Sequence, residues 1–161
     1  MSRYRANLFV PGRPEEKGNH RANIVPIPGA YSETNYRKKY RAYIFDTNDQ
    51  KLKKWQQMIK IAALGQRPPE ILTGPISLDV VFVFARPKTV KRKCHTVAPD
   101  RDKLLRAVQD ALEGVIYKND SQVIAGDTSK IYGDNQGAFI KIREVEKAND
   151  QMFFYSCTDE K

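Results

Sequence analysis

The sequence has little of the chemistry that cross-links a protein or anchors it in a membrane. Its two cysteines, Cys94 and Cys157, occur in no CxxC or Cys/His spacing, so neither a disulfide framework nor a zinc site is expected. A run of about 18 apolar residues is absent, which argues against a membrane-spanning helix. The first apolar run ends at Pro11 and Gly12, so no signal peptide is expected. A reducing cytoplasm is therefore the expected compartment.

Acidic side chains are also scarce relative to basic ones. The 161 residues include 28 Lys and Arg against 19 Asp and Glu, a net charge of +9. This excess points to a polyanionic partner, either nucleic acid or an anionic membrane surface. The membrane surface is the weaker alternative because no basic helix has a strong apolar face to insert. Apolar residues make up 40% of the chain, enough for one core, so residues 1–161 are expected to form a single domain.

Hydrophobic periodicity predicts a domain of strands and helices. Alternating side chains predict a strand over residues 76–84, and helical spacing predicts helices from about 47–49 to 65 and over 101–113. Further strands are expected over residues 6–10, 40–45, 122–132 and 138–145, with 133–137 as a hairpin connection. We expect residues 13–39 to be a flexible loop and residues 147–161 a loosely ordered tail. The fold class is therefore α+β, a small mixed sheet with two main helices packed on it.

Three aspartates lie around the second predicted helix. Asp100 and Asp102 are at its start, and Asp120 is in the turn that follows it. The helix is roughly 20 Å long, so Asp120 meets the first pair only if the chain after Gly114 doubles back beside the helix. Clustered carboxylates without histidine or cysteine suit Mg²⁺ or Mn²⁺ and do not suit zinc. Such an ion activates water and polarises a phosphodiester oxygen.

A basic segment surrounds the first two aspartates. Residues 86–106 hold eight Lys and Arg against two Asp, a field that attracts the DNA backbone. Arg106 lies one helical turn after Asp102 on the same face, where it can pair with that carboxylate or reach the scissile phosphate. His95, a lone histidine in this segment, is expected to have a structural or surface role. The side chains expected to contact DNA are Lys91, Arg92, Lys93 and Lys103.

The window around these aspartates carries a resemblance. Residues 99–123 read PDRDKLLRAVQDALEGVIYKNDSQV. This segment resembles the signature of the RusA-type Holliday junction resolvases, roughly Asp-x-Asp-Asn-x-x-Lys, then Asp-Ala-Leu, then an aromatic residue and Asp-Asp-x-Gln. The stretches RPKTVKRKCHT and VPGRPEEKG are similar to the basic lead-in of phage and prophage members and to the family's opening turn.

The resemblance implies a site, a partner and an assembly. It implies that Asp100, Asp102 and Asp120 bind Mg²⁺, with Mn²⁺ as a possible substitute, and that no small-molecule cofactor is used. It also implies a homodimer that nicks two opposed strands of a four-way DNA junction. The source implied is a bacterium, or a phage or prophage within one.

Three positions depart from the family's pattern. Lys103 stands where the family has Asn, and Arg106 stands where it has Lys. Arginine does not readily release a proton, so Arg106 is expected to clamp phosphate and not to act as a general acid. The first residue of the family's Asp-Asp pair is Asn119 here, whereas the second is kept as Asp120.

Three functions remain open at this point. The first is a metal-dependent endonuclease that resolves four-way junctions by paired symmetric nicks, leaving 5′-phosphate and 3′-hydroxyl ends in DNA recombination and repair. The second is a non-catalytic module that binds branched DNA, which Lys103 and Arg106 suggest. The third is a nuclease that acts on flaps or forks as well. If the chain binds no metal, Asp100 is explained as an ordinary helix N-cap residue, and Asp102 as a negative charge that the helix dipole stabilises in the first turn.

Overall fold

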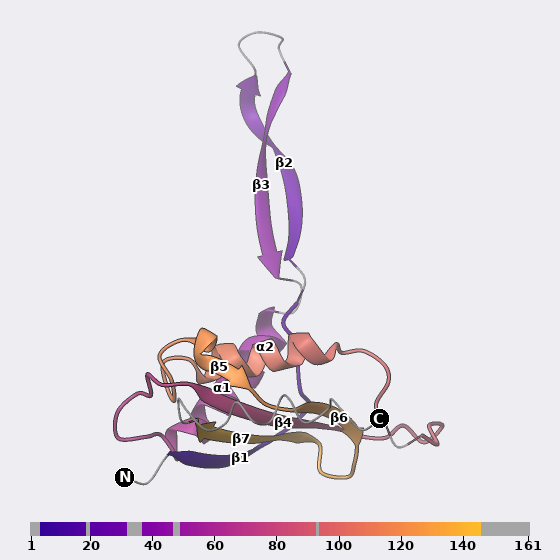
Figure 1. Cartoon of the computed structure of the whole chain (residues 1–161). Coiled ribbons are helices and arrows are strands. Elements are labelled where there is room, and N and C mark those ends of the chain that lie inside the picture. The colour runs from indigo at the N-terminus through magenta and orange to yellow at the C-terminus, as the bar shows by residue number, and fades with distance from the viewer. Residues whose placement is uncertain (1–3, 19, 32–36, 47–48, 93, 146–161) are drawn as a thin grey trace, which may run out of the picture.

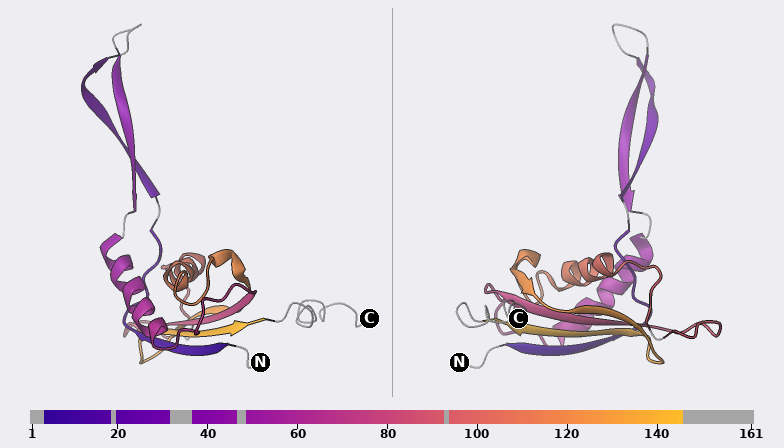
Figure 2. Two further views of the ribbon diagram at one scale, coloured as in Figure 1. Left: turned by 90° about the vertical axis from the view of Figure 1, so that its left-hand side faces the viewer. Right: turned by 45° about the vertical axis from the view of Figure 1, so that its right-hand side comes forward.

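The body of the protein is a mixed five-stranded sheet with two helices on one face, and a two-stranded arm projects from it (Figure 1, Figure 2). The structure is a computed structural model that describes residues 4–18, 20–31, 37–46, 49–92 and 94–145. The sheet holds β1 (Arg5–Pro11), β4 (Ile76–Phe84), β5 (Val123–Ala125), β6 (Thr128–Tyr132) and β7 (Gly137–Glu144). The helices are α1 (Asp49–Leu64) and α2 (Arg101–Leu112), and a short 3₁₀ helix, η1, spans Asp120–Gln122. The α+β class with a mixed sheet and two helices is confirmed.

The predicted strand over residues 76–84 is the centre of the sheet. β4 pairs antiparallel with β7 and parallel with β5 and β6, and β1 extends the sheet beyond β7. Seven of its nine residues are buried. This central position explains why Val81 and Val83 stand where a half-exposed strand would carry polar side chains.

The strand predicted over residues 122–132 is in fact two strands, β5 and β6. The chain turns between them at Gly126, whose φ is +138°. A Cβ atom at this position would lie 1.9 Å from the Leu78 carbonyl oxygen of β4. Only glycine combines this backbone angle with so close an approach, so the break depends on the residue at 126 and on its neighbour in space.

The predicted hairpin over residues 133–137 is wrong. β6 and β7 pair with opposite edges of β4 and do not pair with each other. Their connection passes the end of β4, where the Gly133 N–H donates to the Phe84 carbonyl at 3.0 Å. Turn residues show that a chain reverses, but they do not show whether another strand lies between the two that they join.

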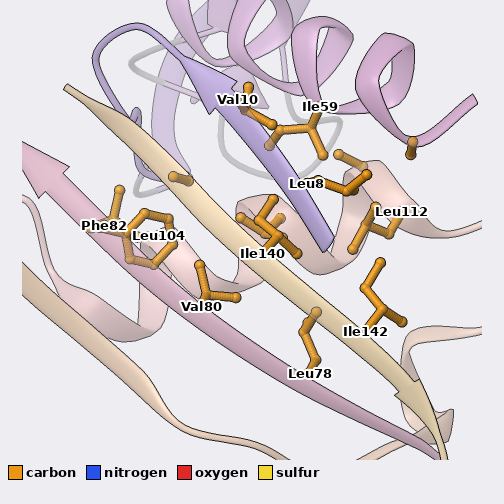
Figure 3. Packing of buried hydrophobic residues seen from close by; sticks show 14 of the residues in the cluster. Leu8, Val10, Ile59, Leu78, Val80, Phe82, Leu104, Leu112, Ile140 and Ile142 are labelled. Carbon is orange, nitrogen blue, oxygen red and sulfur yellow. The ribbon is translucent and has the colours of Figure 1, made fainter. Parts of the chain in front are cut away.

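One core joins the sheet to both helices. Figure 3 shows side chains from β1, β4, β7, α1 and α2 meeting in a single apolar cluster. Helical spacing explains the contribution of α2, because its buried positions fall on one face. The labelled members are Leu8, Val10, Ile59, Leu78, Val80, Phe82, Leu104, Leu112, Ile140 and Ile142. Since both helices cover the same face, the start of α2 is held at a fixed place over the sheet.

The arm replaces most of the loop predicted over residues 13–39. β2 (His20–Tyr31) and β3 (Lys38–Asp46) pair antiparallel as a separate two-stranded sheet. The loop prediction is therefore wrong for residues 20–31 and 38–39, whereas the predicted strand over 40–45 is confirmed as part of β3. Pro26, Pro28 and Gly29 are residue types that strands disfavour, but a two-stranded arm has free edges on which proline is tolerated.

Two further expectations concern the C-terminal tail and a membrane-spanning helix. The tail predicted over residues 147–161 lies outside the described residues. Within the part that the structure describes, no helix is long and apolar enough to cross a membrane.

Candidate metal and nucleic-acid site

Asp100 occupies the N-cap position of α2 without capping it. Its backbone is extended and its carbonyl accepts the Leu104 N–H at 3.0 Å, but its side chain makes no capping hydrogen bond. The carboxylate instead lies 2.9 Å from the Lys103 ammonium, one turn along the helix. The hydrogen bond from Lys103 lowers the pKa of Asp100. The side chain is therefore a charged, exposed carboxylate, and capping does not explain its presence.

The loop before Asp100 is fastened to β6. The Lys130 ammonium donates to the carbonyl oxygens of Val97 at 2.8 Å and Pro99 at 2.6 Å. The Arg101 guanidinium reaches the Thr128 carbonyl at 3.5 Å. These bonds set the place at which α2 begins, and Lys130 adds positive charge near the Asp100 carboxylate.

Glu16 is a site residue that sequence reasoning missed. Its Oε2 atom accepts the Asp100 backbone N–H at 2.7 Å, across 84 positions of sequence. The neighbouring backbone N–H of Lys17 donates to the Lys103 carbonyl at 3.3 Å. The only sequence signal was an acidic pair, Glu15 and Glu16, within a basic segment.

Three carboxylates share the field of one ammonium at this end of α2. The hydrogen bond to Asp100 raises the pKa of Lys103, and the negative charges of Glu16 and Asp102 raise it further. Asp102 itself is exposed in the first helical turn. Lys103, which is predicted to contact DNA, is paired with Asp100 and stands as a cation among acidic groups.

Asp120 lies beyond the other end of α2. After Gly114 the chain makes a compact turn, in which the Gly114 N–H donates to the Tyr117 carbonyl at 2.8 Å and the Tyr117 hydroxyl donates to the Gln109 carbonyl at 3.0 Å. The segment therefore does not run back beside the helix, and that expectation is wrong. The 12 residues of α2 give the helix a length of about 18 Å, and Figure 1 shows η1 near the C-terminal end of the helix.

The turn that carries Asp120 is itself rigidly held. The Asn119 side-chain oxygen accepts the Ser121 N–H at 2.9 Å, and the Gln122 side-chain oxygen accepts the Asn119 N–H at 2.8 Å. The Gln122 amide also donates to the carbonyl oxygens of Leu72 and Gly74. This capping box presents Asp120 as an exposed carboxylate at a fixed position. Among the described residues, no group of three or more acidic, histidine or cysteine side chains is assembled to hold a metal ion.

Comparison with known proteins identifies the family. The sequence profile of the endodeoxyribonuclease RusA family matches residues 11–143, most of the chain. The chain belongs to the RusA family. A similar protein, the uncharacterized protein YqaN of Bacillus subtilis (strain 168), is 37% identical over 107 residues, which is 59% of this chain and 75% of that one. The matched region includes all three predicted aspartates and the whole arm.

Three of the basic side chains predicted to act on DNA are exposed in this RusA-family chain. Lys91 and Arg92 are exposed in the loop before α2, and Arg106 is exposed on the helix. Lys93 lies outside the described residues. Arg106 makes no ion pair with Asp102 within the described chain, so its guanidinium is open to an anionic ligand. A phosphate is the anion that a RusA nuclease has to bind.

His95 has the structural role expected of it in this RusA-family chain. It is 7% exposed and its ring lies 4.1 Å from the ring of Phe84 and 4.9 Å from that of Tyr132. Burial lowers the pKa of His95, with the charge of Lys130 acting in the same direction. A buried ring between two aromatic neighbours packs the loop onto the sheet.

Proposed function

We propose that this chain is a divalent-metal-dependent endonuclease that resolves four-way DNA junctions. The single observation that carries the proposal is an exposed pair of carboxylates, Asp100 and Asp102, at a fixed helix start inside a strongly basic segment. Membership of an endodeoxyribonuclease family supports the reaction class. The products would be paired symmetric nicks with 5′-phosphate and 3′-hydroxyl ends, made during DNA recombination and repair in the bacterial cytoplasm.

The acidic pair fits Mg²⁺, with Mn²⁺ as a possible substitute. Asp100 has no capping bond to lose, and the hydrogen bond from Lys103 holds its pKa below its usual range, so the carboxylate is charged, as a ligand of a hard cation has to be. We expect Asp100 and Asp102 to hold the ion. When bound, such an ion lowers the pKa of a water molecule and neutralises charge on the phosphate.

The chain's own residues would orient the DNA around this pair. Arg106 projects from the same helix one turn further on, and its guanidinium can take a phosphate oxygen through two N–H groups. Such a clamp stabilises the charge that develops as the phosphodiester is cut. Lys91 and Arg92 would neutralise neighbouring phosphates, which makes the binding dependent on salt.

A homodimer resolves the separation of Asp120 from the acidic pair. Oxygen ligands of one Mg²⁺ lie within about 4.2 Å of one another, because each Mg–O distance is about 2.1 Å. Asp120 follows the far end of α2, a helix about 18 Å long, and the described residues of one chain assemble no group of three such ligands. We therefore propose that each acidic pair is completed by Asp120 of the partner subunit, in a two-fold arrangement that also matches two symmetric nicks.

The test is cleavage of a synthetic four-way junction with Mg²⁺ or EDTA, beside a linear duplex of the same sequence. Asp100→Asn should lower the rate at least about 100-fold, since loss of an outer-shell partner alone costs about 10–100-fold. Asp134→Asn, an exposed aspartate in the connection before β7, is the matched control. Full Mg²⁺-dependent cleavage by Asp100→Asn would refute the proposal.

A second candidate function is favoured by one contact. Lys103 already neutralises Asp100 at 2.9 Å, as a metal would, which suits a non-catalytic module that binds branched DNA. Tight junction binding without nicks in Mg²⁺ or Mn²⁺ would establish that module in place of the nuclease. Flap and fork substrates in the same assay separate a strict resolvase from a nuclease of broader range.

A further inference from the structure

The two-stranded arm, formed by β2 and β3 and here called the β-arm, is uncovered. It forms its own sheet, and within the described residues no strand of the body pairs with it. Its large side chains are open to solvent: Ile24 is 69% exposed, Tyr40 59% and Tyr43 51%. A lone two-stranded sheet is marginally stable in water. Exposed aromatic groups on such an element point to a binding partner.

The charge of the β-arm indicates the chemistry of that partner. Residues 23–31 and 37–43 contain four basic side chains and no acidic one. Arg41 is opposite Val25 and Tyr43 opposite Asn23, so these residues share one face. Lys38 and Tyr40 share the other face by the two-residue period of a strand. Each face therefore combines a cation with a tyrosine, the pairing that binds a phosphate backbone and packs on sugars or bases.

The β-arm leaves the body beside the acidic pair. The segment before β2 contacts α2 at two places: Glu16 accepts the Asp100 N–H at 2.7 Å at the start of the helix, and Lys17 pairs with Asp110 at 2.7 Å in its last turn. These contacts fasten the base of the arm to the helix that carries Asp100. Figure 1 and Figure 2 show the arm rising from the helical side of the sheet. DNA bound at Asp100 would therefore pass the base of the arm.

A second copy of the chain is a poorer occupant of this surface. Pro26 and Pro28 lack backbone N–H groups, which reduces the donors that β2 could offer to an added strand. Over residues 23–31 and 37–43 all charged side chains are basic, so these parts of two copies would also repel each other. DNA is the polymer whose charge complements the four basic side chains within residues 37–41.

We propose that the β-arm is a DNA-binding element that lies in a groove of one duplex of the branched substrate. The inference rests on the proposed function, because it places the substrate at the acidic pair. A two-stranded ribbon fits the major groove, which is about 12 Å wide. The 12 residues of β2 extend about 40 Å, which is slightly more than one turn of duplex DNA, about 34 Å.

The experiment compares two charge-reversal variants of the full chain. The β-arm variant carries Lys38→Glu, Lys39→Glu and Arg41→Glu. The control variant carries the same charge change at exposed positions of the body, Lys60→Glu, Arg67→Glu and Lys141→Glu. Junction affinity is measured by fluorescence anisotropy over a salt series in EDTA, and dimer mass by sedimentation.

The β-arm variant should bind at least about tenfold more weakly at 0.1 M salt than the control variant. Each lost phosphate contact lowers the slope of log affinity against log salt by about 0.9, so three lost contacts lower it by about 2.7. Tyr40→Ala with Tyr43→Ala should weaken binding at least about fivefold with the slope kept. Thermal unfolding of the body should be unchanged, which separates lost contacts from misfolding.

Two results would overturn the inference while leaving the proposed function in place. Equal affinity and slope for the two charge-reversal variants, with junction cleavage intact, would show that the β-arm does not touch DNA. Loss of dimer mass in the β-arm variant alone would assign the arm to a second copy. If the unaltered chain neither binds nor cuts a junction, the inference and the proposed function fail together.

Discussion

The proposed sharing of Asp120 between subunits can be tested by mixing two inactive variants. Asp100→Asn and Asp120→Asn are each expected to abolish cleavage when assayed alone, because each removes one carboxylate from both sites of the dimer. In a mixed dimer the two changes fall in the same shared site. The other site then retains Asp100 from one chain and Asp120 from its partner, so cleavage should return.

The size of the recovery follows from the symmetry. Random exchange of equal amounts gives about half mixed dimers, each with one complete site of two, so the mixture should show about a quarter of the wild-type nicking. The product should be a junction nicked on one strand, because paired nicks need two sites. Denaturing gels count the nicks, and native gels show whether the junction separates.

Assembly of the site within one chain gives a different result. Each chain of the mixture would then carry one altered carboxylate in its own site, and no complete site would exist in any dimer. A mixture that stays at the background of the single variants, after exchange of subunits has been verified by mass, would refute the reasoning. Full activity of Asp120→Asn alone would remove that residue from the site altogether.

Three further outcomes follow from contacts in the structure. Lys103→Ala frees the Asp100 carboxylate from an ammonium 2.9 Å away, so half-maximal cleavage should need less Mg²⁺; an unchanged requirement contradicts the competition. Tyr117→Phe removes a buried hydroxyl bonded to a helix carbonyl and should cost about 0.5–1.5 kcal/mol in urea unfolding. Burial raises the pKa of Tyr117, so the folded protein keeps this proton at a pH where the unfolded chain has lost it. The contribution of Tyr117 to the free energy of unfolding is therefore complete below about pH 10, the pKa of an unfolded tyrosine, and falls above it. Above that pH the Tyr117→Phe variant should lose less stability than the unaltered chain. Gly126→Ala places a Cβ atom 1.9 Å from the Leu78 carbonyl oxygen at a φ of +138°. The free energy of unfolding should therefore fall by about 1–3 kcal/mol or more, which a thermal melt detects as a lower melting temperature. An unchanged melting temperature would show that the turn can relax.

Local patterns determined the elements that carry the core and the acidic motif. The strand of residues 76–84 and the helices α1 and α2 followed from the periods of their apolar side chains, because burying one face imposes that period whatever else the chain does. The charge excess and the Asp100 and Asp102 pair within basic residues were also readable without a structure. So was the family resemblance, since it is carried by residues close together in the sequence.

Only the tertiary structure decided how distant segments meet. Glu16 reaches the Asp100 N–H across 84 positions of sequence, a contact that no local pattern encodes. The strands β6 and β7 are separated by β4 because pairing depends on which edge is free, not on the turn between them.

The place of Asp120 shows the same division most clearly. The sequence determined that this carboxylate follows the helix, but the distance back to Asp102 depends on how residues 114–119 turn. Backbone bonds at Gly114 and the Asn119 capping box close that turn locally, so α2 keeps its full length between the two groups. Sequence chemistry thus singled out the candidate carboxylates, whereas the length of a packed helix and the turn after it decided that Asp120 follows the end of α2 opposite to Asp100 and Asp102.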